Sequence, residues 1–151
     1  VVCAGVAAVA LAVASPRLPI DDLVTRLTRG RTIADLGLQA AVPQLRQGRH
    51  LVALLDLDGP HVTETIERLN DLAATPGVPA VLGLTPATEE AVGAFFWAAS
   101  PAFPIRSIDR AVLKRLYRRL PRFFVVDGGR VTAVYDRAVP RAEDLLSSGP
   151  S

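Results

Sequence analysis

The alternation of hydrophobic and polar positions divides the chain into segments with different periods. The run Leu51–Leu57 is apolar except for Asp56, and such a run predicts a buried strand. Asp58-Gly59-Pro60 interrupts it, and apolar residues then recur at helical spacing. We therefore expect a helix with Pro60 at its first position, where a missing backbone N–H costs nothing. The apolar face of this helix consists of Val62, Ile66, Leu69 and Leu72.

A second strand and a second helix follow in the same order. The turn Pro76-Gly77 leads into Val78–Leu84, another apolar run, and Thr85-Pro86 then introduces and caps a helix over Ala87–Ala99. Strand, helix, strand and helix in succession imply parallel strands joined by right-handed crossovers. The elements expected next are an extended run, Phe103–Ile108, and a helix capped by Asp109, Arg110–Leu120.

The last two strands are expected to form a hairpin. Asp127-Gly128-Gly129 lies between two runs rich in β-branched and aromatic residues, which is a strong short-range hairpin signal. Leu120-Pro121 stands directly before the first of these runs, and a short helix is expected over Arg141–Leu146. An antiparallel hairpin added to parallel βαβ units predicts an α/β domain whose mixed central sheet is flanked by helices.

The first residues differ in character from the rest. Residues 1–15 are almost wholly apolar, but the run is shorter than the roughly 20 residues of a membrane span and lacks a preceding basic region. We interpret it as a membrane or signal-like segment (a cleaved leader, an anchor or the end of a longer membrane segment), with a buried core helix as the alternative. Residues 16–44 are expected to form a helical connector, in which Thr32 caps a helix over Ile33–Leu45. The expected domain follows over residues 45–148.

Composition and charge exclude some partners. The net charge of +2 is too small to indicate nucleic acid. Lys114 is the only lysine among 17 basic residues, and together with abundant alanine this indicates a GC-rich bacterial genome. One basic segment is interpreted as a solvated helix face, with an anionic membrane surface or an acidic partner as alternatives. Its residues are Arg106, Arg110, Lys114, Arg115, Arg118, Arg119 and Arg122.

The order of the expected elements, with two short motifs, resembles the thioredoxin-like superfamily. In that family a Cys-x-x-Cys pair begins the first helix, and bacterial extracytoplasmic members, including domains attached to DoxX-type membrane segments, often have Cys-Pro-His-Cys there. Gly59-Pro60-His61-Val62 resembles this motif with both cysteines replaced. Pro121 resembles the cis-proline that faces the same helix in the family. The resemblance implies a thioredoxin-like fold over about residues 45–146.

A second resemblance is to the haloacid dehalogenase-like phosphatases. Asp56-Leu57-Asp58-Gly59 after an apolar strand resembles their first motif, which would make Asp56 the nucleophile and Asp58 an acid or base in a magnesium-dependent reaction. That family has a threonine where Pro60 stands and needs a further parallel strand that ends in acidic metal ligands. The thioredoxin-like interpretation is therefore preferred. Residues that could imitate the other phosphatase motifs are Thr85, Lys114 and Asp127.

The cysteine count decides what chemistry the thioredoxin-like site can perform. Cys3 is the only cysteine in the sequence, so no intramolecular disulfide and no cysteine metal site can form. Gly59 and Val62 have no thiol that could attack or resolve a disulfide. His61 stands beside them without an identifiable catalytic partner. We therefore predict no catalytic residue, no metal and no cofactor at this site.

We expect a binding or structural module rather than an enzyme. A protein or peptide partner would meet the groove between Gly59-Pro60-His61-Val62 and Leu120-Pro121, with His61, Leu120 and Pro121 as its binding residues. Residues 1–15 would hold the domain at the extracytoplasmic face of the cell membrane. The phosphatase is one alternative function, and a decayed gene fragment without function is another.

Overall fold

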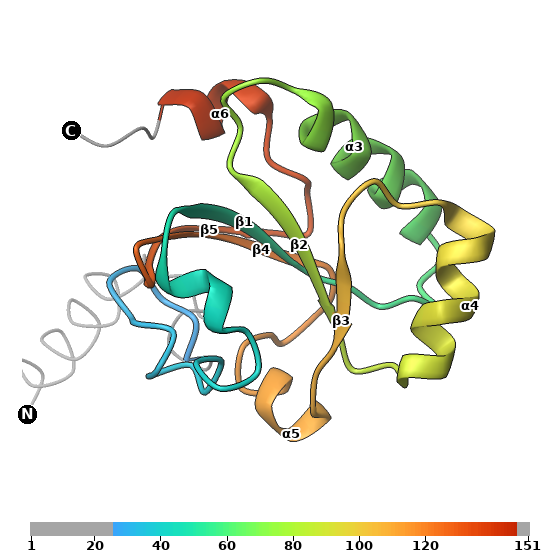
Figure 1. Ribbon diagram of the computed structural model, residues 1–151, viewed down its shortest axis with the longest axis horizontal. Helices are drawn as coiled ribbons and strands as arrows, with labels where there is room; N and C mark the ends of the chain where they lie inside the picture. The colour runs from blue at the N-terminus through green and yellow to red at the C-terminus, as the bar shows by residue number, and fades with distance from the viewer. Residues whose placement is uncertain (1–25, 148–151) are drawn as a thin grey trace, which may run out of the picture.

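A five-stranded sheet forms the centre of residues 26–147, which are the residues that the computed structural model describes (Figure 1). The strand order is β3-β2-β1-β4-β5. The pairs β1–β2 and β2–β3 are parallel, whereas β4 is antiparallel to both β1 and β5, which confirms the predicted mixed sheet. The described elements are, in chain order, η1 (a 3-10 helix) Pro43–Arg46, β1 Arg49–Leu54, α3 Val62–Ala74, β2 Ala80–Thr85, α4 Glu89–Ala99, β3 Ile105–Ser107, α5 Arg110–Leu113, β4 Arg122–Asp127, β5 Arg130–Asp136 and α6 Ala142–Ser147.

The apolar N-terminal segment expected over residues 1–15 lies outside the described residues, as does the first part of the connector. Within residues 26–147, no helix combines the length and the apolar character that crossing a membrane requires. The division of the chain at residues 15 and 44 and the domain limits of 45–148 stay predictions.

Alternate residues of β1 point to opposite faces of the sheet, and each face has its own covering layer. Leu51 and Ala53 pack in a cluster with buried residues of α3, α4 and α6. Val52 and Leu54 pack on the other side with residues from 27–45 and from α5. Figure 1 shows α3 and α6 above the sheet. Below the sheet lie α5 and the blue and teal segment that precedes β1. Burial on both faces explains why this strand is apolar without alternation.

Helix α3 begins two residues later than predicted. His61 is its N-cap residue, so Pro60 lies in the loop and not in the first turn. The predicted apolar face is confirmed, since Val62 packs partly buried against the core and three further residues are buried. The buried face also includes Thr65, which the hydrophobic pattern does not indicate. The three buried apolar residues are Ile66, Leu69 and Leu72.

Helix α4 is also shorter than predicted at its start. The cap is Thr88, whose hydroxyl accepts a hydrogen bond from the backbone N–H of Ala91 at 3.2 Å. Thr85, the predicted cap, is instead the buried last residue of β2, and its hydroxyl accepts from the N–H of Ala87 at 3.3 Å. The single tryptophan, Trp97, projects from this helix with 92% of its surface exposed.

The predicted hairpin is confirmed. Asp127 pairs with Arg130, so Gly128-Gly129 forms a two-residue turn between β4 and β5. The φ angles of the two glycines are 56° and 82°. Both central residues of a type I′ turn need positive φ, which glycine adopts without a steric penalty. The two glycines therefore allow the sharp reversal that places β5 against β4.

The predicted helix over Ile33–Leu45 is wrong, because this stretch consists of separate turns followed by the start of η1. Thr32 caps the first turn as expected: its hydroxyl accepts from the N–H of Asp35, and the carboxylate of Asp35 accepts from the N–H of Thr32. Gly37 then ends the turn with φ of 75°. The N–H of Leu38 donates to the carbonyl of Ile33 and that of Gly37 donates to Ala34, which is the bonding pattern of a Schellman motif.

Residues 30–33 run beside the start of β5, on the side opposite β4. The N–H of Gly30 donates to the carbonyl of Val131 at 2.8 Å, and the N–H of Val131 donates to the carbonyl of Arg31 at the same distance. Ile33 donates to the carbonyl of Gly129 at 2.9 Å. The N-terminal part of the described chain therefore pairs with the edge of the sheet as well as covering one face.

The predicted helix over Arg110–Leu120 is wrong beyond Leu113. The carbonyl of Arg115 accepts from the N–H of Arg26 at 2.8 Å, and the carbonyl of Leu116 accepts from the guanidinium of Arg122 at 2.9 Å. The N–H groups of Arg115 and Leu116 donate to carbonyls three residues back instead of four, so the regular α-helical ladder does not continue. The basic residues after Leu113 therefore do not form the helical stripe that their spacing predicts.

Candidate functional site

The loop between β1 and α3 is folded by its own hydrogen bonds. The N–H of Asp58 donates to Oδ1 of Asp56 at 3.1 Å, and the N–H of Gly59 donates to the carbonyl of Asp56 at 3.1 Å. The N–H of Val62 donates to the carbonyl of Gly59 at 3.3 Å. The carboxylate of Asp56 thus makes a local turn of the kind that aspartate commonly forms.

The first turn of α3 fixes the backbone of His61. The hydroxyl of Thr65 donates to the carbonyl of His61 at 3.0 Å, and the N–H of Thr65 donates to the same oxygen at 3.1 Å. The His61 imidazole is exposed and makes no capping hydrogen bond. Glu64 and Arg68 form an exposed ion pair of 2.8 Å on the same helix. The main chain of His61 is therefore fixed by hydrogen bonds, while its side chain is exposed.

The peptide bond Leu120–Pro121 is cis, as the family resemblance implies. It lies directly before β4, where Leu54 at the end of β1 pairs with Arg122. Since β1 and β4 are antiparallel, the residues that follow Leu54 and the residues that precede Arg122 meet at the same end of the sheet. The register of these two strands therefore brings Pro121 to the β1–α3 loop.

These two segments enclose one cavity of about 140 Å³. The structure thus brings together Gly59-Pro60-His61-Val62 with Leu120-Pro121, all of which the sequence singles out. Leu55, Asp56 and Thr65 complete the lining. Of these, Leu55 is 1% exposed and forms the floor from the end of β1. The role of His61, Leu120 and Pro121 as binding residues stays a prediction.

A second hollow of about 330 Å³ continues the surface on the other side of Pro121. It shares His61, Thr65, Leu120 and Pro121 with the first cavity. The rest of its wall comes from α3, through Glu64 and Arg68, and from the chain that follows β5, including Arg137. Sequence reasoning does not find Arg137, because only the return of the chain after β5 places it beside Pro121. We call the two adjoining hollows the Pro121 groove.

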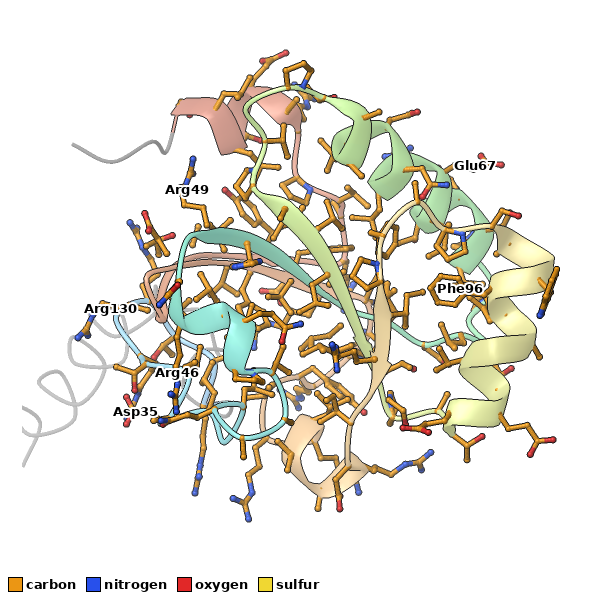
Figure 2. The ribbon with its side chains drawn as sticks, viewed as in Figure 1. Asp35, Arg46, Arg49, Glu67, Phe96 and Arg130 are labelled. Carbon is orange, nitrogen blue, oxygen red and sulfur yellow. The ribbon has the colours of Figure 1, made fainter. Side chains whose placement is uncertain are left out.

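The phosphatase residues are not gathered at this site. Asp127 pairs with Arg49 at the start of β1, whereas Asp56 follows the end of the same strand. In Figure 2, Arg49 and Arg130, the two residues that pair with Asp127, lie on the side of the molecule away from α4. Lys114 is exposed in the segment after α5. Moreover, β4 runs antiparallel to β1, whereas that family requires a further parallel strand.

The Pro121 groove offers apolar surface and hydrogen-bonding groups. Within residues 26–147, no three side chains of His, Cys, Asp or Glu are grouped so that they could ligate a metal ion. The sequence contains no cysteine other than Cys3, which lies outside the described residues. The cavity beside Pro121 offers the apolar side chains of Leu55, Val62 and Leu120.

Comparison with known proteins places this geometry in context. No protein-family model matches the chain, and no curated protein matches it either. Solved structures do match. A thiol:disulfide interchange protein from Bacteroides sp. aligns with a TM-score of 0.55 and 14% identity over 70% of this chain and 72% of its own. A peroxiredoxin Q from Xanthomonas campestris aligns with a TM-score of 0.58 and 15% identity over 71% and 80%.

A third match covers more of the chain. It is a secreted disulfide oxidoreductase from Mycobacterium tuberculosis, with a TM-score of 0.52 and 14% identity over 80% of this chain and 92% of its own. The chain has a thioredoxin-like fold. At these identities the likeness concerns the fold alone, and it agrees with the element order, the mixed sheet and the cis Leu120–Pro121 bond. The thioredoxin-like fold predicted from the sequence is confirmed.

Proposed function

We propose that this chain is a thioredoxin-fold binding module in which the redox dithiol has been replaced. The observation that carries the proposal is the cavity beside Pro121, whose wall holds Gly59 and Val62 where the thioredoxin-like motif has its two cysteines. Glycine and valine cannot attack or resolve a disulfide, so this site can hold a partner but cannot exchange thiols with it.

An extended peptide is the partner that the site favours. Main-chain groups beside a strand can pair with a peptide, while pockets for alternate side chains select its sequence. The cavity beside Pro121 is small and lined by Leu55, Val62 and Leu120, which suits one apolar side chain of the partner. His61 stands exposed at its rim, where its imidazole can hydrogen-bond to the peptide.

Selection from a library of short random peptides tests this function on the full chain. We expect peptides to be enriched that share an apolar residue and lose binding when Val62 is changed to Asp, because a carboxylate then lines the apolar cavity. Ala98→Asp provides the matched control, since Ala98 is exposed on α4 and lines neither part of the Pro121 groove. Equal enrichment on the Val62→Asp variant would show that peptides do not bind there.

A thiol-exchange assay tests the loss of redox activity separately. The full chain is expected to reduce insulin no faster than dithiothreitol alone. Acceleration by the full chain that the Cys3→Ser variant loses would contradict the proposal, because Cys3 is the only cysteine in the sequence.

We further propose that residues 1–15 tether the module at the extracytoplasmic face of a bacterial membrane, in the manner of domains attached to DoxX-type segments. The apolar character of these residues supports this arrangement. When the tagged chain is expressed in a bacterial host, we expect it to sediment with membranes and to be cut by protease added to spheroplasts. Recovery in the cytosolic fraction would contradict the tether.

The phosphatase and the gene fragment without function are not adopted. The strand direction of β4 does not support a phosphatase, and a fully formed double-sided core does not support a decayed fragment. Phosphate release from a broad substrate panel that Asp56→Asn abolishes would reinstate the phosphatase. Unfolding without a cooperative transition would reinstate the fragment.

A further inference from the structure

A pocket lined almost wholly by arginine lies next to the Pro121 groove. Its volume is about 240 Å³, and five residues line it. Four are arginines and one is an aspartate, which gives the lining a formal charge of three positive units. We call this pocket the arginine pocket. Its residues are Arg118, Arg119, Arg122, Asp136 and Arg137.

The aspartate of the arginine pocket is engaged by the arginine beneath it. Arg122 is 1% exposed, its Nε lies 2.7 Å from Oδ1 of Asp136, and a terminal nitrogen donates to the carbonyl of Leu116 at 2.9 Å. Arg119 and Arg137, by contrast, are exposed at the rim. The pocket therefore has a fixed base and presents exposed guanidinium groups above it.

The arginine pocket and the Pro121 groove meet at Arg137. The backbone N–H of Arg137 donates to the carbonyl of Pro121 at 3.1 Å, which fixes the main chain of Arg137 against the proline. The backbone of Arg137 is left-handed, with φ of 63°. Arg137 lines both the arginine pocket and the larger hollow of the groove. A peptide that lies along the groove would thus pass directly beside the arginines.

We propose that the partner of this site is an extended acidic peptide segment of another protein, with an apolar residue in the cavity beside Pro121 and an aspartate or glutamate in the arginine pocket. This inference rests on the proposed binding function. Arginine guanidinium groups bind carboxylates with charge-assisted and often bidentate hydrogen bonds. The positive lining supplies the complementary charge, which steers association and selects the partner.

The geometry favours a peptide over an anionic membrane surface. A membrane would be met by basic residues on one flat outer face, whereas these arginines converge on a hollow that a single side chain can enter. It also shares Arg137 with the larger hollow of the Pro121 groove, which leads to the cavity beside Pro121, so one extended segment can reach both. Four arginines from two separate stretches of the sequence form this hollow, and helical spacing alone does not predict it.

The peptide selection described above tests the inference directly. Peptides enriched on the full chain are expected to carry Asp or Glu at a fixed distance from the apolar residue. Arg119→Gln combined with Arg137→Gln should weaken a selected peptide about tenfold, as the loss of a charge-assisted contact would. Arg115→Gln is the matched control, because Arg115 is exposed on the same segment but does not line the arginine pocket. Added salt should also weaken binding to the parent chain more than to the double variant.

The possible failures are distinguishable. Enriched peptides without an acidic preference, bound equally well by the double variant, would overturn the acidic partner and leave the proposed binding function intact. Absence of any enriched peptide would overturn the binding function itself. In that case, NMR titration with hexaglutamate still decides the chemistry of the pocket: shifts at the backbone amides of Arg119 and Arg137 support it, and unchanged spectra overturn it. Vesicles of phosphatidylglycerol that bind in an Arg119-dependent and Arg137-dependent way, without any effect of hexaglutamate, would replace the peptide with a membrane.

Discussion

Arg122 and Asp136 are direct partners across β4 and β5, and their side chains are joined by an ion pair of 2.7 Å from Nε to Oδ1. The arginine is 1% exposed, whereas the aspartate side chain is 46% exposed. A guanidinium cannot lose its charge under ordinary conditions, so it depends on its partners once buried. This pair anchors the first residue of β4 directly after Pro121, and it therefore stabilises one side of the candidate site.

Asp136→Asn is expected to reduce the free energy of unfolding by about 1–3 kcal/mol, because it removes the carboxylate from a buried guanidinium while the contact to Leu116 remains. This loss of stability is smaller than the loss expected for a fully buried ion pair, because the Asp136 side chain is in contact with water. Denaturant unfolding with a constant m value measures the change.

Asp127→Asn provides the comparison for that experiment. Asp127 lies 4.0 Å from Nε of Arg49, and neither side chain is deeply buried. The expected loss is less than about 1 kcal/mol, as for exposed ion pairs generally. Equal losses from the two variants would contradict the special dependence of Arg122 on Asp136.

Two cysteines introduced at positions 59 and 62 should form a disulfide. We expect Gly59→Cys with Val62→Cys, in a chain that also carries Cys3→Ser, to give a reversible disulfide, because the proposed function places these two residues where the thioredoxin-like motif has its cysteines. The Cβ atom added at Gly59 would lie 3.1 Å from the carbonyl oxygen of Asp56, so the loop must shift by a few tenths of an ångström. Mass spectrometry and thiol titration measure the bond.

The single variant Gly59→Cys is the control for this experiment, since it tolerates the same local shift without an internal partner. It is expected to keep one free thiol. Two titratable thiols in the double variant under oxidising conditions would show that the loop geometry differs from that of a dithiol site.

Two glycines offer a matched test of packing. At Gly83 in β2, an added Cβ would lie 2.9 Å from Cγ1 of Ile105 and 3.3 Å from the ring of Phe103, so Gly83→Ala should destabilise the protein by about 1–3 kcal/mol. At Gly93 in α4 nothing lies within 4 Å, and Gly93→Ala should stabilise the protein by about 0.5–1 kcal/mol. Thermal unfolding distinguishes the two signs, and a loss in both variants would contradict the open space at Gly93.

Asp35 predicts a specific dependence of stability on pH. Hydrogen bonds from the backbone N–H of Thr32 and then from its hydroxyl lower the pKa of Asp35 below its ordinary value of 3.8. A lowered folded-state pKa stabilises the folded protein above the unfolded value, and this contribution is lost as the pH falls through the folded value. Asp35→Asn should therefore lower the free energy of unfolding at neutral pH and have a smaller effect in acid.

Thr32→Ala tests the same contact from the other side, because it removes the hydroxyl donor and leaves the backbone donor in place. It should reduce the pH-dependent part of stability without abolishing it. A difference between the parent chain and Asp35→Asn that stays constant from neutral to acid pH would contradict the assignment.

The sequence predicts those elements whose signal is local. The apolar run of β1, the apolar face of α3 and the Gly128-Gly129 turn each have a pattern that short-range physics explains, and the structure has all three. The resemblance to the family's cis-proline correctly predicts the cis bond of Pro121, directly before β4. The segments around the site therefore follow from the sequence nearly to the residue.

The two helices that the sequence predicts wrongly have different causes. The expected helix over Ile33–Leu45 passes through Gly37, whose positive φ ends the turn, and this glycine is a local signal against a long helix. The segment after Leu113 instead makes contacts that no local pattern indicates, such as the hydrogen bond from the N–H of Arg26 to the carbonyl of Arg115. The arginine pocket, to which Arg137 contributes from beyond β5, is missed for this second reason.

Residues 30–33 pair with the start of β5, and this pairing affects how readily the protein can self-associate. Unpaired strand edges are templates for edge-to-edge aggregation, and proteins commonly protect them. One edge of this sheet is partly occupied by the chain's own backbone, and the other edge is β3, which is only three residues long. Both edges of the sheet are therefore poor templates for pairing with a second copy of the chain.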